Sequence, residues 1–399
     1  MLAMALGVGL IIPLLPVYAS EMGASGLWIG LIFGANPLIR GVFTLFLGSL
    51  SDRMDKKKLI LAGLMGYTLV AFGFIAATLP WHLFMMRVLQ GAFSAAVQPV
   101  ARAYAGRLTP RGSEGRVMGI FNLAFFAGFA LGPLTGGLMA DAWGIAAPFL
   151  GMAALSALAA ALAAFYVPSQ LPQRDSNGQL PQLRRGVDLR PLSDRHVLGM
   201  IVGRSMLAVG RGIFSTLMPI FGESVLALGA AQIGLVVTLR STLESTLQAP
   251  MGKVADVFDR RLISIVCFTL IPLSLALIPM ATSHRTLILF AALMGLGSGA
   301  GVPAVTAMAV EKGRTWGMGS LMGLEGVAMS FGMAFGSSLS GALMEATSVL
   351  FAFRAAAVVG VLGILAFARL TQGYRTERVA VEEVTAATPA SKSANGDAG

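Results

Sequence analysis

Residues 48–59 read GSLSDRMDKKKL, and six of these twelve residues are charged. The stretches on both sides of this segment are long and apolar. The whole chain has 399 residues, of which 56% are hydrophobic and 12% charged, with a mean hydropathy of +0.77. Soluble domains carry roughly 25% charged residues. The composition therefore predicts an integral membrane protein in which GSLSDRMDKKKL is a loop.

Apolar stretches long enough to cross a bilayer, which takes about 20 residues, recur along nearly the whole chain. Continuous apolar runs of this length are typical of membrane helices, whereas barrel strands are alternating segments of about ten residues. The sequence therefore predicts an all-α, multi-pass protein with twelve transmembrane helices. We expect them at 2–20, 26–50, 58–79, 81–106, 115–140, 143–166, 196–221, 230–251, 261–281, 285–309, 317–342 and 350–370.

Lys and Arg are distributed unequally between the two sets of connecting loops. Loops on the side of GSLSDRMDKKKL carry sixteen basic residues, whereas the opposite set carries essentially Arg285 alone. The positive-inside rule places the basic loops in the cytoplasm, together with both chain termini. The net charge of +10 then has a topological cause, so we expect no nucleic-acid partner.

The chain contains an internal repeat with an offset of 204 residues. Gly91 and Pro99 correspond to Gly295 and Pro303, and Asp141 corresponds to Glu345. Each repeat holds six helices, so the two halves share one orientation and are related by a pseudo-two-fold axis along the membrane normal. We expect an N-terminal bundle at 1–166, a cytoplasmic linker at 167–195, a C-terminal bundle at 196–370 and a disordered tail at 371–399. A substrate site is expected between the halves.

GSLSDRMDKKKL resembles the signature loop between the second and third helices of the major facilitator superfamily. RVLQG at 87–91 and GFALGPLTGG at 128–137 resemble the patterns of its fourth and fifth helices, and the latter occurs chiefly in antiporters. The resemblance covers residues 1 to about 370. It implies a transporter, most similar to twelve-helix exporters of drugs and small molecules.

The charged loop and its second copy, GKVADVFDRRL, are interpreted as two cytoplasmic latches. The resemblance implies that the acid after the second helix meets the N-terminal end of helix 11, whose dipole attracts a carboxylate. The alternative is that the basic residues only set topology. The latch residues are Gly48, Asp52, Arg53, Lys56, Lys57, Gly252, Asp256 and Arg260.

The fifth helix is a candidate gating helix. Gly128, Gly132 and Gly136 lie four residues apart, so they share one helix face and allow a neighbouring backbone to approach closely. Pro133 removes an internal hydrogen bond, and Gly137 completes the motif. The alternative is tight packing without a role in transport.

Charged residues within the apolar spans are candidates for coupling, because each must be paired or hydrated in the membrane. Arg40 and Glu325 are expected at similar depth on helices 2 and 11, which the resemblance implies meet at the interface between the halves, so we predict an ion pair between them. Arg240 and Glu244 lie one turn apart on one helix and should pair with each other. Either glutamate could carry a proton, or both could be structural.

Arg87, Gln90, Arg204 and Arg211 are assigned to the substrate pathway. Arg204 and Arg211 lie seven residues apart with no acid in their own helix. They could line a path for anions, or Arg211 could reach Glu244.

The function expected from these observations is secondary transport by alternating access, with proton-coupled export of small amphipathic molecules. The alternative is a carrier or exchanger of organic anions, and a receptor without transport is disfavoured. No P-loop is present, and no constellation of catalytic residues or metal ligands stands out. We expect no enzymatic activity, metal or cofactor, and a monomer in the inner membrane of the cell.

Overall fold

A computed structural model describes residues 1–51, 54–108, 114–169 and 188–374. Asp52 and Arg53 of the first latch, most of the linker and most of the tail lie outside these ranges. The described residues form thirteen α-helices and two short 3-10 helices.

The N-terminal half consists of α1 (Leu2–Ile11), α2 (Leu15–Glu21), α3 (Gly26–Ser51), α4 (Lys56–Ile75), α5 (Pro80–Leu108), α6 (Glu114–Trp143) and α7 (Ala146–Tyr166). The C-terminal half consists of η1 (Arg190–Ser193), α8 (Arg195–Ser224), α9 (Ala230–Val257), α10 (Arg260–Leu277), η2 (Ile278–Met280), α11 (His284–Trp316), α12 (Met318–Ala346) and α13 (Val349–Leu370).

Helices α1 and α2 together make the first membrane crossing. The break between them falls at Ile12–Leu14, next to Pro13, whose missing N–H cannot continue the helix. Pro16 lies in the first turn of α2, where proline is tolerated. Counted in this way, the described helices form the twelve predicted crossings.

Ten of these crossings have the length and mean hydropathy of a membrane span within the described residues. Helices α5 and α9 are not among them. They carry Arg87 and the Arg240–Glu244 pair, which lower their hydropathy. The two helices are continuous, but charged residues interrupt their apolar runs. These charged side chains are buried, as intramembrane charges generally are.

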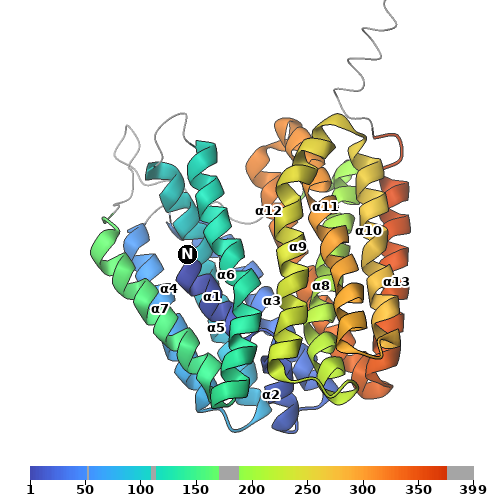
Figure 1. Ribbon diagram of the computed structural model, residues 1–399. Coiled ribbons are helices and arrows are strands. Elements are labelled where there is room, and N and C mark those ends of the chain that lie inside the picture. The colour runs from blue at the N-terminus through green and yellow to red at the C-terminus, as the bar shows by residue number, and fades with distance from the viewer. Residues whose placement is uncertain (52–53, 109–113, 170–187, 375–399) are drawn as a thin grey trace, which may run out of the picture.

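Two repeat-related helix pairs, α3 with α12 and α6 with α9, make the main contacts between the halves. Gly30 and Gly341 approach each other across the first pair, and Gly234 approaches the Pro133 carbonyl across the second. At the opposite end, a side chain at Gly252, Gly323 or Gly326 would meet open space. Figure 1 shows the two halves converging at the end that holds α2 and diverging at the other. The halves are therefore closed on the side away from the basic loops.

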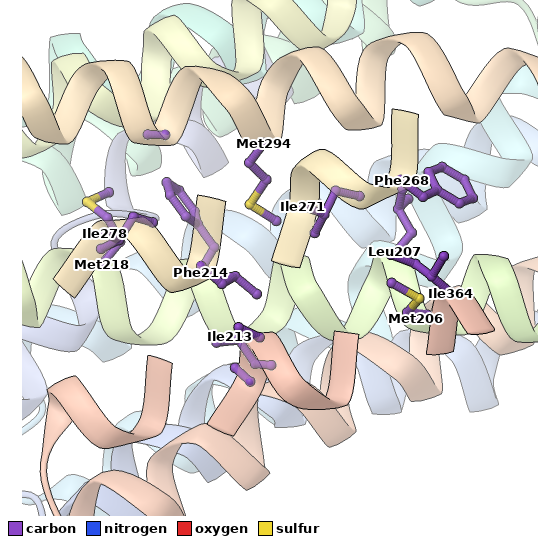
Figure 2. Close-up of a cluster of buried hydrophobic side chains, with 14 of the residues drawn as sticks. Met206, Leu207, Ile213, Phe214, Met218, Phe268, Ile271, Ile278, Met294 and Ile364 are labelled. Atoms are coloured by element: carbon purple, nitrogen blue, oxygen red, sulfur yellow. The ribbon is translucent and has the colours of Figure 1, made fainter. Parts of the chain in front are cut away.

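Each half has a hydrophobic core of its own. Figure 2 shows part of the C-terminal core, where Leu207 of α8 lies near Phe268 of α10 and Met206 lies beside Ile364 of α13. An apolar cavity of about 230 Å³ lies between α8, α10 and α13, beside Met206 and Ile271. It has no charged lining residue among those the structure describes, so it is separate from the ionic groups described below.

Residues 371–374, which were assigned to the disordered tail, pack against the C-terminal half. Thr371 is fully buried, and Tyr374 is 6% exposed. The Tyr374 hydroxyl donates to Glu311 at 2.8 Å. These four residues therefore pack with the C-terminal half, which the sequence did not predict because the hydrogen bonds of Tyr374 were not visible in it.

Candidate functional site

Glu244 lies between two arginines near the centre of the C-terminal half. Arg240 Nη2 donates to its Oε2 at 2.9 Å, and Arg211 of α8 donates to its Oε1. The Arg240 guanidinium also lies 5.0 Å from the centre of the Phe214 ring. The predicted Arg240–Glu244 pair is therefore present, and Arg211 pairs with Glu244, which was one of its two expected roles.

Glu325 of α12 pairs with Arg204 of α8 and not with Arg40. Arg204 Nε lies 3.9 Å from Glu325 Oε2, and the structure describes no ion pair between Arg40 and Glu325. The prediction of that pair was wrong because it used only the depth of the two residues and the contact between their helices. Depth along a helix does not define which neighbour a side chain faces, and α12 packs extensively on α8 as well as α3.

The Glu325–Arg204 pair is incomplete. The second carboxylate oxygen, Oε1, is buried and has no hydrogen-bond partner among the described residues, and neither has Arg204 Nε. Glu244, in contrast, accepts a hydrogen bond on each of its oxygens. The two interior glutamates therefore differ in how well their charges are compensated.

Arg87 and Gln90 form the polar centre of the N-terminal half. Arg87 Nη1 donates to Gln90 Oε1 at 2.7 Å, and Arg87 Nε donates to the Ile32 carbonyl at 3.2 Å. The guanidinium lies 5.3 Å from the centre of the Phe33 ring. Asn36 Nδ2 also donates to Gln90 Oε1, at 3.3 Å. These contacts join α5 to α3.

Arg40 lies one turn beyond Asn36 on α3 and is half-buried. It is an electrostatic neighbour of Arg87 and of Tyr67 on α4. Within the described residues, no carboxylate pairs with Arg40 or Arg87. The four residues predicted to line the substrate pathway thus form two groups: Arg87 and Gln90 lie with Arg40, whereas Arg204 and Arg211 lie with the glutamates.

The basic loops make the same contacts in both halves. Asp55 accepts a hydrogen bond from the Lys57 N–H, and Asp259 accepts one from the Arg261 N–H, so each aspartate caps the following helix. Lys57 Nζ donates to the Ala164 carbonyl at 2.8 Å. Arg261, the repeat partner of Lys57, donates to the carbonyl of Ala368, the repeat partner of Ala164, at 2.9 Å. These basic residues therefore bind carbonyls near helix C-termini.

In the second copy of the predicted latch, Arg260 makes its contacts within the C-terminal half. Arg260 donates to Glu311 at 2.7 Å and lies 3.7 Å from Asp256, whose side chain is 63% exposed. Space beside Gly252 is open. In the first copy Lys56 is buried, while Asp52 and Arg53, and the surroundings of Gly48, lie outside the description. The predicted contact of Asp52 with helix 11 stays a prediction.

At the closed end, two acids bind the start of a helix in the other half. Asp141 accepts hydrogen bonds from the Ala230 and Ala231 N–H groups, at 3.1 and 3.0 Å. Glu345 accepts from the Leu27 N–H and the Ser25 hydroxyl, both at 2.7 Å. The two acids occupy corresponding positions in the internal repeat, but no role was predicted for them from the sequence.

The candidate gating helix, α6, packs closely on α1 through the predicted glycine face. Gly132 lies against Gly9, and Gly136 against the Leu10 backbone. Gly128 lies beside Ala5. On its other side, Gly137 contacts the start of α9 at Ala230. The helix therefore contacts both halves at the closed end through residues with little or no side chain.

One carboxylate outside the membrane-spanning helices links the linker to the bundle. Asp194 accepts hydrogen bonds from Lys312 Nζ and from the His196 N–H, both at 2.8 Å. Burial acts to raise the pKa of Asp194, but these hydrogen bonds outweigh it and hold the pKa below its usual value. Asp194 is therefore ionised at neutral pH and joins the start of α8 to α11.

Comparison with known proteins identifies the family. The model of the Major Facilitator Superfamily matches residues 1–231 and 200–395. An uncharacterised MFS-type transporter of Methanocaldococcus jannaschii is 30% identical over 92% of this chain and 95% of its own length. Multidrug resistance protein 2 of Bacillus subtilis is 24% identical over 90% of each chain.

The fold agrees with this result. A crystal structure of the nucleoside transporter NupG superposes with a TM-score of 0.78 at 15% identity, covering 93% of this chain and 98% of that one. Membership indicates a membrane transporter and not an enzyme. The chain, with its twelve crossings in two repeat-related halves, belongs to the major facilitator superfamily.

Proposed function

We propose that this transporter exports small amphipathic molecules in exchange for protons, by alternating access. The basic loops and both chain termini are placed in the cytoplasm by the positive-inside rule. The protein acts as a monomer in the cell membrane. Asp141 and Glu345 then lie on the outer side, and the described conformation is open toward the cytoplasm.

Alternating access is supported by the arrangement of contacts between the halves. The two interfaces, α3 with α12 and α6 with α9, are related by the internal repeat and joined at the outer end by backbone contacts and by two acids. Rocking of one half against the other would release these contacts and bring the basic loops together. No covalent or cofactor chemistry is needed for this movement.

The proton is assigned to Glu325, and the single observation that carries this assignment is its unpaired oxygen. Glu325 is 5% exposed, and its Oε1 has no hydrogen-bond donor among the described residues. A buried carboxylate with an unsatisfied oxygen gains little from ionisation, so protonation costs it little. Arg204, 3.9 Å away, would stabilise the ionised form when the proton leaves.

Glu244 is assigned a structural role. Glu244 accepts hydrogen bonds from two arginines, and its protonation would leave both of their charges without a counter-ion inside the membrane. Of the two interior acids, one is thus proposed as the proton carrier and the other as part of a structural ion pair.

Export of amphipathic cargo is supported by relatives. Multidrug resistance protein 2 of Bacillus subtilis matches the chain over nearly its full length. The chain also holds 22 Met and 23 Phe residues, and flexible Met side chains adapt to varied ligands.

The test is transport into proteoliposomes with an imposed pH gradient, using ethidium as the probe. Wild-type protein should move ethidium against its concentration gradient only while the pH gradient lasts. Glu325→Gln should lose this gradient-driven accumulation but retain exchange of ethidium between equal pH compartments. Accumulation by Glu325→Gln equal to that of wild type would contradict the assignment.

Arg354→Gln is a suitable control, because Arg354 is exposed on α13 and has no assigned role. It should transport like wild type. Loss of transport in this variant as well would indicate a general defect and not a defect in proton coupling.

A further inference from the structure

The polar centre of the N-terminal half has hydrogen-bond donors in excess of acceptors. Its side chains come from three helices: Asn36 and Arg40 from α3, Tyr67 from α4, and Arg87 and Gln90 from α5. Arg40 and Arg87 are electrostatic neighbours of each other and of Tyr67. Two positive charges are therefore brought together in the interior of one half.

No carboxylate compensates these two charges within the described residues. The described ion pairs inside the membrane, Arg204–Glu325, Arg211–Glu244 and Arg240–Glu244, all belong to the C-terminal half. The repeat partner of Arg40 is Glu244. The position that holds a neutralising acid in the C-terminal half is therefore occupied by an arginine in the N-terminal half. Each of these C-terminal arginines thus lies beside a glutamate, whereas Arg40 and Arg87 lie beside no acid among the described residues.

Gln90 supplies a second, independent indication of a ligand. Its Oε1 accepts hydrogen bonds from both Arg87 and Asn36, so the opposite orientation of the amide would place its NH₂ against two donors. The Nε2 group must therefore point away from them. It is fully buried and has no hydrogen-bond partner among the described residues.

The cluster lies next to the interface between the halves. Arg40 is half-buried, and a side chain at the following residue, Gly41, would meet Ser330 of α12 across the interface. Arg40 therefore lies beside the interface at which the proposed cargo would be held between the halves.

We propose that Arg40, Arg87 and the Gln90 amide form a binding site for one small anionic group, such as a carboxylate. The proposal rests on the transport function above and adds a substrate class to its cargo: amphipathic molecules with an acidic group. Buried cations and an unsatisfied donor are all compensated by one acceptor with a negative charge. The guanidinium of Arg40 suits a carboxylate, since it can donate two parallel hydrogen bonds.

The same chemistry would suit the acidic group of the cargo or a free inorganic anion such as chloride. These two sources share the site but differ in what they do to transport. An acidic group on the cargo makes the site select between substrates, whereas a free anion would affect all substrates equally.

The first test is direct binding to purified protein in detergent, measured as the shift of the unfolding temperature. Benzoate is the probe, benzamide is its uncharged isostere, and chloride represents the free anion. Benzoate or chloride should raise the unfolding temperature of wild type, and benzamide should not. Arg40→Gln should abolish the shift, Arg40→Lys should keep part of it, and Arg354→Gln should keep all of it. Equal shifts in wild type and Arg40→Gln, or no shift with any anion, would overturn the site.

The second test is transport in proteoliposomes with two dyes, a rhodamine that has a free carboxylate and the methyl ester of the same rhodamine. If the site binds the cargo, Arg40→Gln should reduce transport of the carboxylate dye at least tenfold and leave the ester dye within twofold of wild type. If the site binds a free anion, both dyes should depend on chloride in wild type and neither should in Arg40→Gln.

Unchanged transport of both dyes by Arg40→Gln, independent of chloride, would overturn the anion site and leave the proposed export standing. Absence of transport of either dye by wild type would contradict the proposed function instead, and the benzoate measurement would then decide the anion site alone. Transport of the ester dye by Arg40→Gln also serves as proof that the variant is folded.

Discussion

Asp141 and Glu345 are 204 residues apart in the chain, and each binds the first N–H groups of a helix in the opposite half. A carboxylate at a helix N-terminus is stabilised by the exposed N–H groups and by the helix dipole. The internal repeat thus builds the same closing contact twice, once on α9 and once on α3. Both contacts exist only while the halves are joined at this end.

The first prediction follows from these contacts. Asp141→Asn and Glu345→Gln should each weaken the closed end by about 1 kcal/mol, because the charge at a helix start is lost. Each change should shift the equilibrium about fivefold toward opening at that end. The shift is measured as the labelling rate of a cysteine at Ala231, with Cys267 replaced by Ser. Glu21→Gln, an exposed acid at the same end, is the control. Unchanged labelling in the double variant would contradict the role of these contacts.

The second prediction distinguishes the two interior glutamates by stability. Glu244→Ala should lower the free energy of unfolding by about 3–5 kcal/mol, because it leaves Arg211 and Arg240 buried without a partner. Glu325→Ala should lower the free energy of unfolding by clearly less, since one oxygen of Glu325 already lacks a hydrogen-bond partner. Thermal unfolding in detergent measures both. A larger loss in Glu325→Ala than in Glu244→Ala would show that the two roles are reversed.

Features that depend on the chain or on a single helix were predicted correctly from the sequence, whereas a contact between helices was not. The twelve crossings and the repeat were predictable because length, hydropathy and offset are properties of the chain alone. The Arg240–Glu244 pair was predictable because helical spacing defines neighbours within one helix. The partner of Glu325 was not, since it depends on how α12 is rotated between α3 and α8.

Several other contacts have no signature in the sequence from which they could be predicted. The hydrogen bonds from Lys57 and Arg261 end on backbone carbonyls, which every residue has. The repeat relation of Asp141 to Glu345 was visible, but a capping role needs the facing helix start to be placed in space. The orientation of the Gln90 amide likewise depends on Asn36 and Arg87 from two helices.

The third prediction concerns pH. The pKa of Asp194 is lowered in the folded protein, so its contribution to stability is complete above the usual aspartate pKa of about 4 and is lost as the pH falls through the lower folded value. Between about pH 5 and 8 this contribution should be constant. Unfolding temperature as a function of pH measures it.

Two variants separate the functions of Asp194. Asn is a good helix N-cap, so Asp194→Asn should remove only the ion pair with Lys312, at a cost of about 1 kcal/mol or less. Asp194→Ala should cost about 1 kcal/mol more, because the cap on the His196 N–H is also lost. Equal stability of the two variants would contradict the capping role.

The fourth prediction concerns the contact between α6 and α1. Gly136→Ala should destabilise the protein by about 1–3 kcal/mol, because its new methyl group would collide with the Leu10 carbonyl. Gly326→Ala should be neutral or stabilising, since that position has open space and alanine favours the helix. Thermal unfolding of the two variants checks this pair. Equal effects of both changes would contradict the close approach at Gly136.

The central claim is that the two halves open alternately at their two ends. Distances between paired spin labels, in a background with Cys267 replaced by Ser, test it most directly. One pair, at Phe46 and Met318, spans the end with the basic loops, and the other, at Trp143 and Val225, spans the opposite end. Lowering the pH or adding a transported dye should shift the two distance distributions in opposite directions. Distances that change together, or that stay fixed while transport proceeds, would contradict the account.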